Sequence, residues 1–228
     1  MDEMSTLEVQ ITNRSQEHPG EALTNLHSFI DIEMLNKSFG MLNKDSKSGV
    51  DGQTWEEYNE ERMTRITKLY TAFKSGAYRS PHVRRAYIEK EDGKKRPLGV
   101  PTVEDKLLQT AVNRVLTPIY EQIFLENSYG FRPGKSAHQA LDKLFKEVSF
   151  KGMRYVIDAD IKNYFGSINH QCLREFLDLR IKDGVIRKQI DKWLKAGIME
   201  GGQVSYPKEG TPQSLPRWLS GAEVFHRC

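Results

Sequence analysis

The sequence predicts an α+β fold in which helices pack on antiparallel strands. Two short segments of strand-like composition, 83–88 and 96–100, flank an Asp-Gly pair that suits a tight turn, so they predict a β-hairpin. Several segments before and after this hairpin repeat apolar residues at helical spacing, the longest over residues 103–124. A chain of 228 residues, 38% of them hydrophobic, can bury a real core in one or two domains.

Local signals predict the remaining elements. Thr54 and Glu57 have the spacing of a capping box at the start of a helix, and Pro118 is expected to kink or break the helix over residues 103–124. Residues 1–29 are largely polar and without periodicity, so we expect them to be flexible. Strands are predicted over residues 154–160 and 204–206, and further helices over residues 30–42, 54–76, 136–148, 169–179 and 185–196.

Composition excludes two classes of protein. No apolar run approaches the roughly 20 residues that a membrane-spanning helix needs, so the sequence predicts no integral membrane protein. The first 20 residues have neither the basic nor the apolar region of a secretory signal. We therefore expect a cytoplasmic protein in which Cys172 and Cys228 are reduced thiols.

The net charge of +3 is unevenly distributed along the chain. Residues 1–33 contain seven acidic residues and one basic residue, whereas residues 74–96 contain eight Lys or Arg against three acids. Such a basic body favours a partner with a phosphate backbone. An ordinary solvated surface would explain the same balance.

Asp158 and Asp160 end the apolar segment 154–160. Residues two apart on a strand point to the same face, so the two carboxylates would lie side by side. Paired carboxylates repel each other unless a cation lies between them, and Mg²⁺ binds carboxylates together with phosphate oxygens and water. The alternative is a strand end that reaches solvent, where the acids need no partner.

Other blocks of sequence bear on this choice. The chain contains, in this order, six blocks: Ser48 to Gly52, Lys90 to Arg96, Pro97 to Lys106, Tyr129 to Pro133, Asp158 to Phe165, and Gly210 to Gln213. Together they resemble the group II intron reverse transcriptases, also called maturases, over roughly residues 30–213. Retron and CRISPR-associated polymerases share part of the set. The resemblance implies a right-hand polymerase fold, RNA-directed DNA synthesis with Mg²⁺, an RNA partner and a DNA primer.

The resemblance also implies roles for residues in the palm. Asp160 matches the first metal-binding aspartate, and the carbonyl of Ile161 would complete the shell of one magnesium ion. Phe165 matches the aromatic side chain that excludes a ribose 2′-OH, and Gln213 would lie against the primer or the incoming nucleotide.

Roles in the fingers follow in the same way. Lys90 and Arg96 match the cations that hold the nucleotide triphosphate, and their places on either side of a hairpin turn allow both to reach one anion. Two solvated hairpin charges are the alternative. The residues expected to contact RNA or template are Arg84, Arg85, Lys95, Tyr129, Phe131 and Arg132, on one positive surface.

The sequence also departs from the family pattern. Gly166 stands where the family has an acid, and residues 214–228 resemble nothing in the family. The second catalytic carboxylate motif is absent, so we expect the chain to be a truncated polymerase, catalytically incomplete on its own. The expected organisation is a flexible N-terminus (1–29), fingers (30–150), a partial palm (151–213) and an unrelated tail (214–228). The alternative is an RNA-binding fingers module without polymerase activity.

Overall fold

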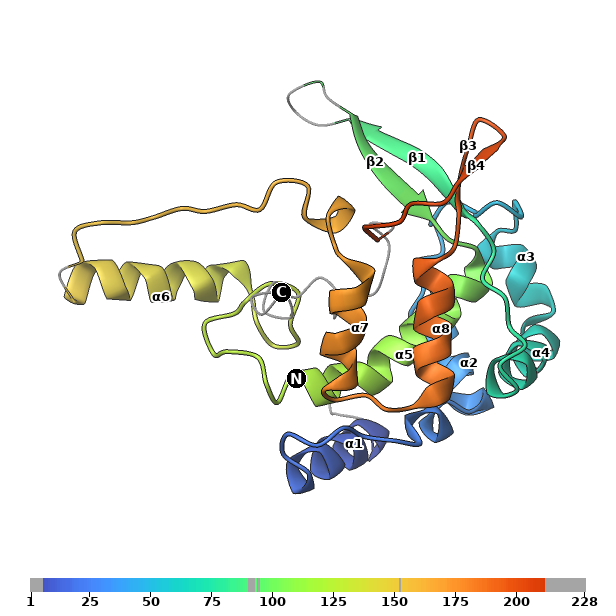
Figure 1. The fold of residues 1–228 in the computed structure, drawn as a ribbon, viewed down its shortest axis with the longest axis horizontal. Coiled ribbons are helices and arrows are strands. Elements are labelled where there is room, and N and C mark those ends of the chain that lie inside the picture. The colour runs from blue at the N-terminus through green and yellow to red at the C-terminus, as the bar shows by residue number, and fades with distance from the viewer. Residues whose placement is uncertain (1–5, 90–92, 94, 152, 212–228) are drawn as a thin grey trace.

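The computed structural model describes residues 6–89, 93, 95–151 and 153–211 (Figure 1). Within this part of the chain, packed helices form the core, and a small mixed sheet lies at one edge of them (Figure 1). The α-helices are α1 (Thr6–Glu17), α2 (Ile32–Gly40), α3 (Trp55–Glu60), α4 (Arg62–Lys74), α5 (Val103–Tyr120), α6 (Ala137–Phe150), α7 (His170–Asp178) and α8 (Gly184–Leu194). Two short 3-10 helices are also present: η1 (Leu26–Phe29) lies between α1 and α2, and η2 (Tyr164–Gly166) lies between α6 and α7. None of the described helices is both long and apolar enough to cross a lipid bilayer.

Helix α5 is the centre of the core. Its buried side chains, among them Leu107, Ala111 and Leu116, belong to one cluster with side chains of α2, α4, α7 and α8. The helix starts at the cap Thr102, whose hydroxyl accepts a hydrogen bond from the backbone N–H of Asp105. Pro118 lies in its last turn, and the helix ends two residues later, as the sequence predicts for a helix-breaking residue.

The sheet has four strands in the order β2-β1-β3-β4. β1 (Val83–Glu89) and β2 (Lys95–Val100) form the predicted antiparallel hairpin, with Ala86 opposite Leu98. Gly93 in its turn has a φ of 75°, which glycine adopts without strain. The sequence did not predict β3 (Ile198–Glu200), which pairs in parallel with the start of β1 and antiparallel with β4 (Gln203–Ser205).

The N-terminal region, expected to be flexible over residues 1–29, has regular structure from residue 6 onward. Residues 6–17 form α1, which packs on α5 and buries Ile11 completely. Arg180 donates a hydrogen bond to the hydroxyl of Ser15 at 2.8 Å, and the N–H of Leu23 donates to the carbonyl of Arg180. These long-range contacts hold the segment, and they cannot be read from its polar local composition.

Helix α6 and the segment that follows it extend away from the core (Figure 1). No residue of α6 is buried, and large apolar side chains are exposed along it. The strand predicted over residues 154–160 is absent: the backbone forms no ladder there, and Tyr155 and Ile157 are 89% and 92% exposed. A strand needs a hydrogen-bonding neighbour, and none of the four described strands runs beside this segment.

Candidate nucleic-acid interface

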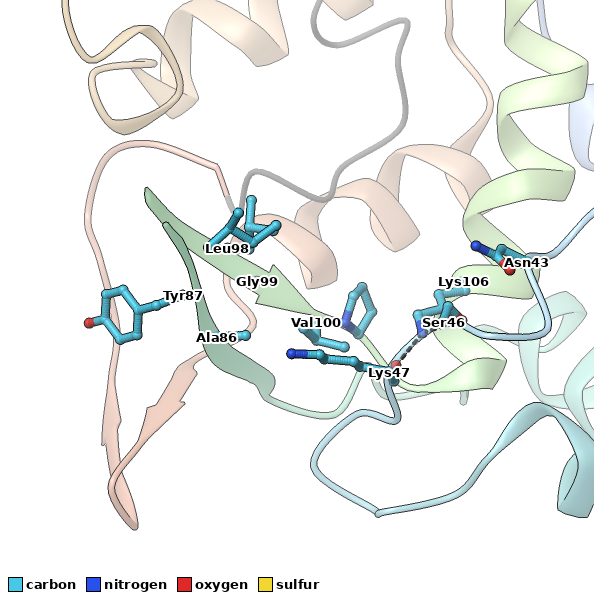
Figure 2. A pocket seen from close by; sticks show the side chains of 11 residues that line it. Asn43, Ser46, Lys47, Ala86, Tyr87, Leu98, Gly99, Val100 and Lys106 are labelled. Carbon is cyan, nitrogen blue, oxygen red and sulfur yellow. Dashed lines mark hydrogen bonds between the residues drawn. The ribbon is translucent and has the colours of Figure 1, made fainter. Parts of the chain in front are cut away.

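An open groove of about 570 Å³ lies between one face of the β1–β2 hairpin and the loop of residues 43–47 (Figure 2). Its floor is apolar and includes Ala86, Leu98 and Val100, which share one face of the hairpin. Its rim is polar, with Lys47 and Lys106 as the cations. Apolar atoms beside cations suit the sugars and bases of a nucleic acid next to its phosphates.

Two cations hold the loop of residues 43–49 in place. The ammonium of Lys106, at the start of α5, donates to the hydroxyl of Ser46 at 3.0 Å and to the carbonyl of Lys47 at 2.6 Å (Figure 2). The guanidinium of Arg84 on β1 donates through two nitrogens to the carbonyl of Ser48, at 3.0 and 2.5 Å. Burial lowers the pKa of Lys106, and the positive charge of Arg84 lowers it further.

Gly49 anchors the same loop by close backbone contact. A Cβ at this position would lie 2.6 Å from the backbone nitrogen of Thr102, closer than side chains tolerate. The loop therefore rests directly on the link between β2 and α5. Since the ammonium of Lys106 is engaged with the loop, Lys47 is the exposed cation that the rim offers to a ligand.

Asp105 fixes the start of α5 against the rest of the core. Its buried carboxylate accepts hydrogen bonds from the hydroxyl of Tyr78 at 3.0 Å and from the indole N–H of Trp193 at 2.9 Å. Burial raises the pKa of this carboxyl to about 6, although the hydrogen bonds from Trp193 and Tyr78 oppose the shift. Asp105 thus positions the helix turn that carries Lys106.

The predicted RNA-contacting cations of the hairpin lie on different faces. Arg84 is engaged with the Ser48 carbonyl, whereas Arg85 points to the other face of β1, where its guanidinium lies 4.0 Å from the carboxylate of Glu200. Lys95 is exposed and lies opposite Glu89 in the register. Lys90 lies outside the described residues, and the backbone of Arg96 lies in β2 as expected.

The loop between α5 and α6 lies apart from the hairpin in Figure 1. Arg132 is bound within this loop: it forms a 2.9 Å ion pair with Glu121 and donates to the carbonyls of Leu125 and Ser128. The ammonium of Lys135 lies 5.2 Å from the centre of the Tyr129 ring.

Phe131, in the same loop, is 70% exposed and has a φ of 57°. The six residues expected to contact RNA therefore do not form one continuous surface. Arg132 stabilises its own loop, because it closes the turn that leads out of α5.

The predicted palm residues are brought together only in part. Asp160 and Ile161 are exposed in the segment without strand structure, and Phe165 is partly buried on the edge of the core. The backbone N–H of Thr211 donates to the carbonyl of Phe165 at 2.7 Å, which places the Gly210 block beside η2. Gln213 lies outside the described residues.

The described residues do not by themselves fit a resident magnesium ion. Asp158 and Asp160 supply carboxylates from an exposed segment, and no group of three or more Asp, Glu, His or Cys in the described part of the chain could hold a metal. The role of Asp160 as a metal ligand thus stays a prediction.

Sequence reasoning missed the groove residues Lys47 and Lys106. Lys106 ends a block that resembles the polymerase family and Lys47 directly precedes another, but the contact between them joins residues 59 positions apart in the chain. The available signal was Gly49, because a glycine in a loop can mark a place where the backbone approaches another segment closely.

The amino-acid sequence of the chain matches a known protein family and several known proteins. The reverse transcriptase (RNA-dependent DNA polymerase) family matches residues 88–216. Group II intron-encoded protein LtrA of Lactococcus lactis subsp. cremoris is 40% identical over 215 residues, which is 92% of this chain and 35% of LtrA. Protein YkfC of Escherichia coli K12 is 34% identical over 168 residues, which is 72% of this chain and 44% of YkfC.

The chain therefore spans about a third of the length of LtrA. An uncharacterized 91 kDa protein in a cob intron of Schizosaccharomyces pombe is 40% identical over 148 residues, 65% of this chain and 18% of that protein. The matched segment begins near the end of β1 and includes β2, and the relatives confirm the resemblance read from the sequence blocks. The chain belongs to the reverse transcriptase (RNA-dependent DNA polymerase) family and is similar to its group II intron-encoded branch.

Proposed function

We propose that this chain is the fingers and the first part of the palm of a group II intron reverse transcriptase, and that it binds RNA along the groove between the β1–β2 hairpin and the loop of residues 43–47. Residues 30–150 are the fingers, and residues 151–213 begin the palm. The observation that carries the proposal is the cationic rim of Lys47 and Lys106 above an apolar strand face, bordering the family match.

The physical chemistry of the groove supports an RNA ligand. Phosphate contacts from Lys47 supply affinity without sequence preference, while the apolar floor receives sugars or bases. Because Arg84 and Lys106 hold the loop backbone, the rim requires little ordering when the ligand binds. We assign the triphosphate of an incoming nucleotide to Lys90 and Arg96, which the sequence places on either side of the Asp-Gly turn.

The palm assignment is supported by the apolar surface of α6 and residues 153–161. Exposed side chains such as Leu144, Phe145 and Ile157 would normally be buried in a core. We propose that the remainder of a polymerase palm covers this surface and pairs with residues 154–160, and that only then does Asp160 contribute, with the carbonyl of Ile161, to a magnesium site. Phe165 and Gln213 would lie at the nucleotide.

A second candidate function is an RNA-binding module without polymerase activity. It is favoured by the position of Asp158 and Asp160 in an exposed segment without strand structure, whereas the groove is formed by the described residues themselves. Both functions predict RNA binding at the groove, and they differ in primer extension.

The test measures RNA affinity and primer extension on the purified chain. Lys47→Glu is expected to weaken binding of a structured RNA and to reduce the slope of log affinity against log salt by roughly one unit for each phosphate that Lys47 neutralises. Lys68→Glu is the control, because Lys68 is exposed on α4, outside the groove. Equal affinity and slope for both variants would contradict the groove assignment. Primer extension by this chain alone would show that it already contains a complete metal site.

A further inference from the structure

A second pocket, of about 440 Å³, lies between the end of α4, the segment of residues 76–82, the C-terminal half of α8 and Tyr206. It shares no residue with the groove between the hairpin and the loop of residues 43–47. The residues that matter for its chemistry are Arg79, His82, Lys188, Lys192, Lys195 and Tyr206. Asp191 is the only acidic residue in its lining.

Three of these cations are aligned on one face of α8 and its cap. Residues 188, 192 and 195 are spaced four and three residues apart, so their side chains are neighbours on the helix surface. Like charges at this spacing destabilise a helix. Asp191 does not offset them, because its carboxylate forms a 2.7 Å ion pair with Arg174.

Some lysines elsewhere on the described surface are paired with a nearby carboxylate. Lys37, Lys146 and Lys151 each form an ion pair with a carboxylate four residues earlier in the same helix. Lys188 and Lys195 have no carboxylate within ion-pair distance in the described part of the chain. A solvated helix face is usually charge-balanced, whereas this one has an excess of positive charge over a concave surface.

Lys192 is fixed in the pocket. Its ammonium donates to the carbonyls of Gly76 and Tyr78, both at 2.7 Å. Burial lowers the pKa of Lys192, and the nearby charges of Arg79 and Lys188 lower it further. Lys192 thus lies close to the like charges of Arg79 and Lys188. An anion bound among these three cations would offset their mutual repulsion.

The pocket also contains aromatic side chains. The rings of His82 and Tyr206 meet edge to face with their centres 5.8 Å apart, and Tyr206 is 65% exposed. A Cβ on Gly197 would come within 2.9 Å of the Tyr206 ring. The missing side chain of this glycine therefore leaves the space that the ring occupies. The buried Nδ1 of His82 has no hydrogen-bond partner among the described residues.

We propose that this basic pocket binds the phosphodiester backbone of RNA, with Tyr206 stacking on a base, as a second RNA contact in addition to the groove. The proposal rests on the proposed RNA-binding function and extends it to a new surface. Fixed cations supply the phosphate contacts, and an exposed ring beside them accepts an unstacked base. A small inorganic anion would contact only the cations of the pocket. RNA can contact both the cations, through its phosphates, and the ring of Tyr206, through a base.

The experiment compares two double charge reversals in the full chain. K188E/K195E removes the exposed pocket cations, and K68E/K182E is a control with the same change in net charge at exposed lysines outside the pocket. Binding of an RNA hairpin with a single-stranded loop is measured over a series of salt concentrations. We expect the pocket variant to bind about 10-fold or more weakly than the control, with the salt slope lower by roughly one to two units.

Thermal unfolding separates this effect from misfolding. In K188E/K195E, a glutamate at position 188 lies four residues before Lys192, which is the favourable orientation for a helix ion pair. The anion that K195E places at the C-terminal end of α8 offsets this gain, so the melting temperature should stay close to that of the wild type while the RNA affinity falls. A second measurement, chemical acetylation of lysines on the wild-type chain, should show Lys188 and Lys195 protected by RNA and Lys68 unprotected.

The outcomes distinguish this inference from the proposed function. If the wild type binds RNA but the pocket variant matches the control, and RNA protects neither pocket lysine, the second contact does not exist and the groove assignment stands. If the wild type does not retain RNA at any salt concentration, the proposed function itself fails. Weaker binding by the pocket variant together with lysine protection supports the second contact.

Discussion

The buried carboxyl of Asp105 predicts a measurable pH dependence of stability. Its pKa is raised from 3.8 to about 6 in the folded protein, chiefly by burial. The folded state therefore binds this proton more tightly than the unfolded state does. By linkage, the contribution of Asp105 to the free energy of unfolding is most favourable below pH 4 and is lost as pH rises through about 6. At about 1.4 kcal/mol for each pKa unit, the loss is about 3 kcal/mol.

The variant Asp105→Asn tests this directly. Its amide oxygen can still accept from the Tyr78 hydroxyl and the Trp193 indole, but it cannot ionise. Relative to the wild type, its free energy of unfolding should rise by up to about 3 kcal/mol between pH 4 and pH 7. Asp105→Ala is the control, because it leaves two buried donors unpaired, at a cost of about 1–3 kcal/mol each.

The assay is urea unfolding followed by circular dichroism at a series of pH values. The difference between wild type and Asp105→Asn isolates this group from other carboxylates that titrate in the same range. A difference that stays constant from pH 4 to pH 7 would refute the reasoning, since it would mean that Asp105 has the same pKa in both states.

Three further predictions concern other parts of the chain. Asp183→Ala should cost about 2 kcal/mol or more in chemical unfolding, because the Asp183 carboxylate caps α8 and accepts from the N–H of His27; an unchanged midpoint would contradict this. Gly210→Ala should lower the melting temperature, since Gly210 has a φ of 83° and a Cβ there would lie 2.8 Å from the carbonyl oxygen of Gly166; a neutral result would show that the contact is loose. Asp160→Ala should leave RNA affinity unchanged in filter binding, because Asp160 is exposed outside the groove; a large loss would place it in the RNA interface.

Local chemistry made the hairpin and the helix starts predictable. The Asp-Gly turn and its flanking segments predicted β1 and β2, and the capping box of Thr54 and Glu57 is present with both hydrogen bonds. Asn169, at the start of the helix predicted over residues 169–179, caps α7 by accepting from two backbone N–H groups. These features depend on residues within a few positions of each other, which a sequence displays directly.

Features that depend on distant partners could not be predicted in this way. The apolar pattern of residues 154–160 is that of a strand, but a strand forms only beside another, and none of the described strands lies there. β3 is too short for a periodic signal and depends on its parallel pairing with β1. Arg132 has the composition of a nucleic-acid contact, yet Glu121, eleven residues earlier, engages it.

Photo-crosslinking can decide whether the groove between the β1–β2 hairpin and the loop of residues 43–47 is the RNA-binding face of this reverse transcriptase chain. The purified chain is crosslinked to RNA that contains 4-thiouridine, and the attached peptides are identified by mass spectrometry. We expect crosslinks within residues 43–49 and 83–106, which line the groove. RNA that binds and crosslinks elsewhere on the chain, but to no peptide from these two segments, would contradict the groove assignment.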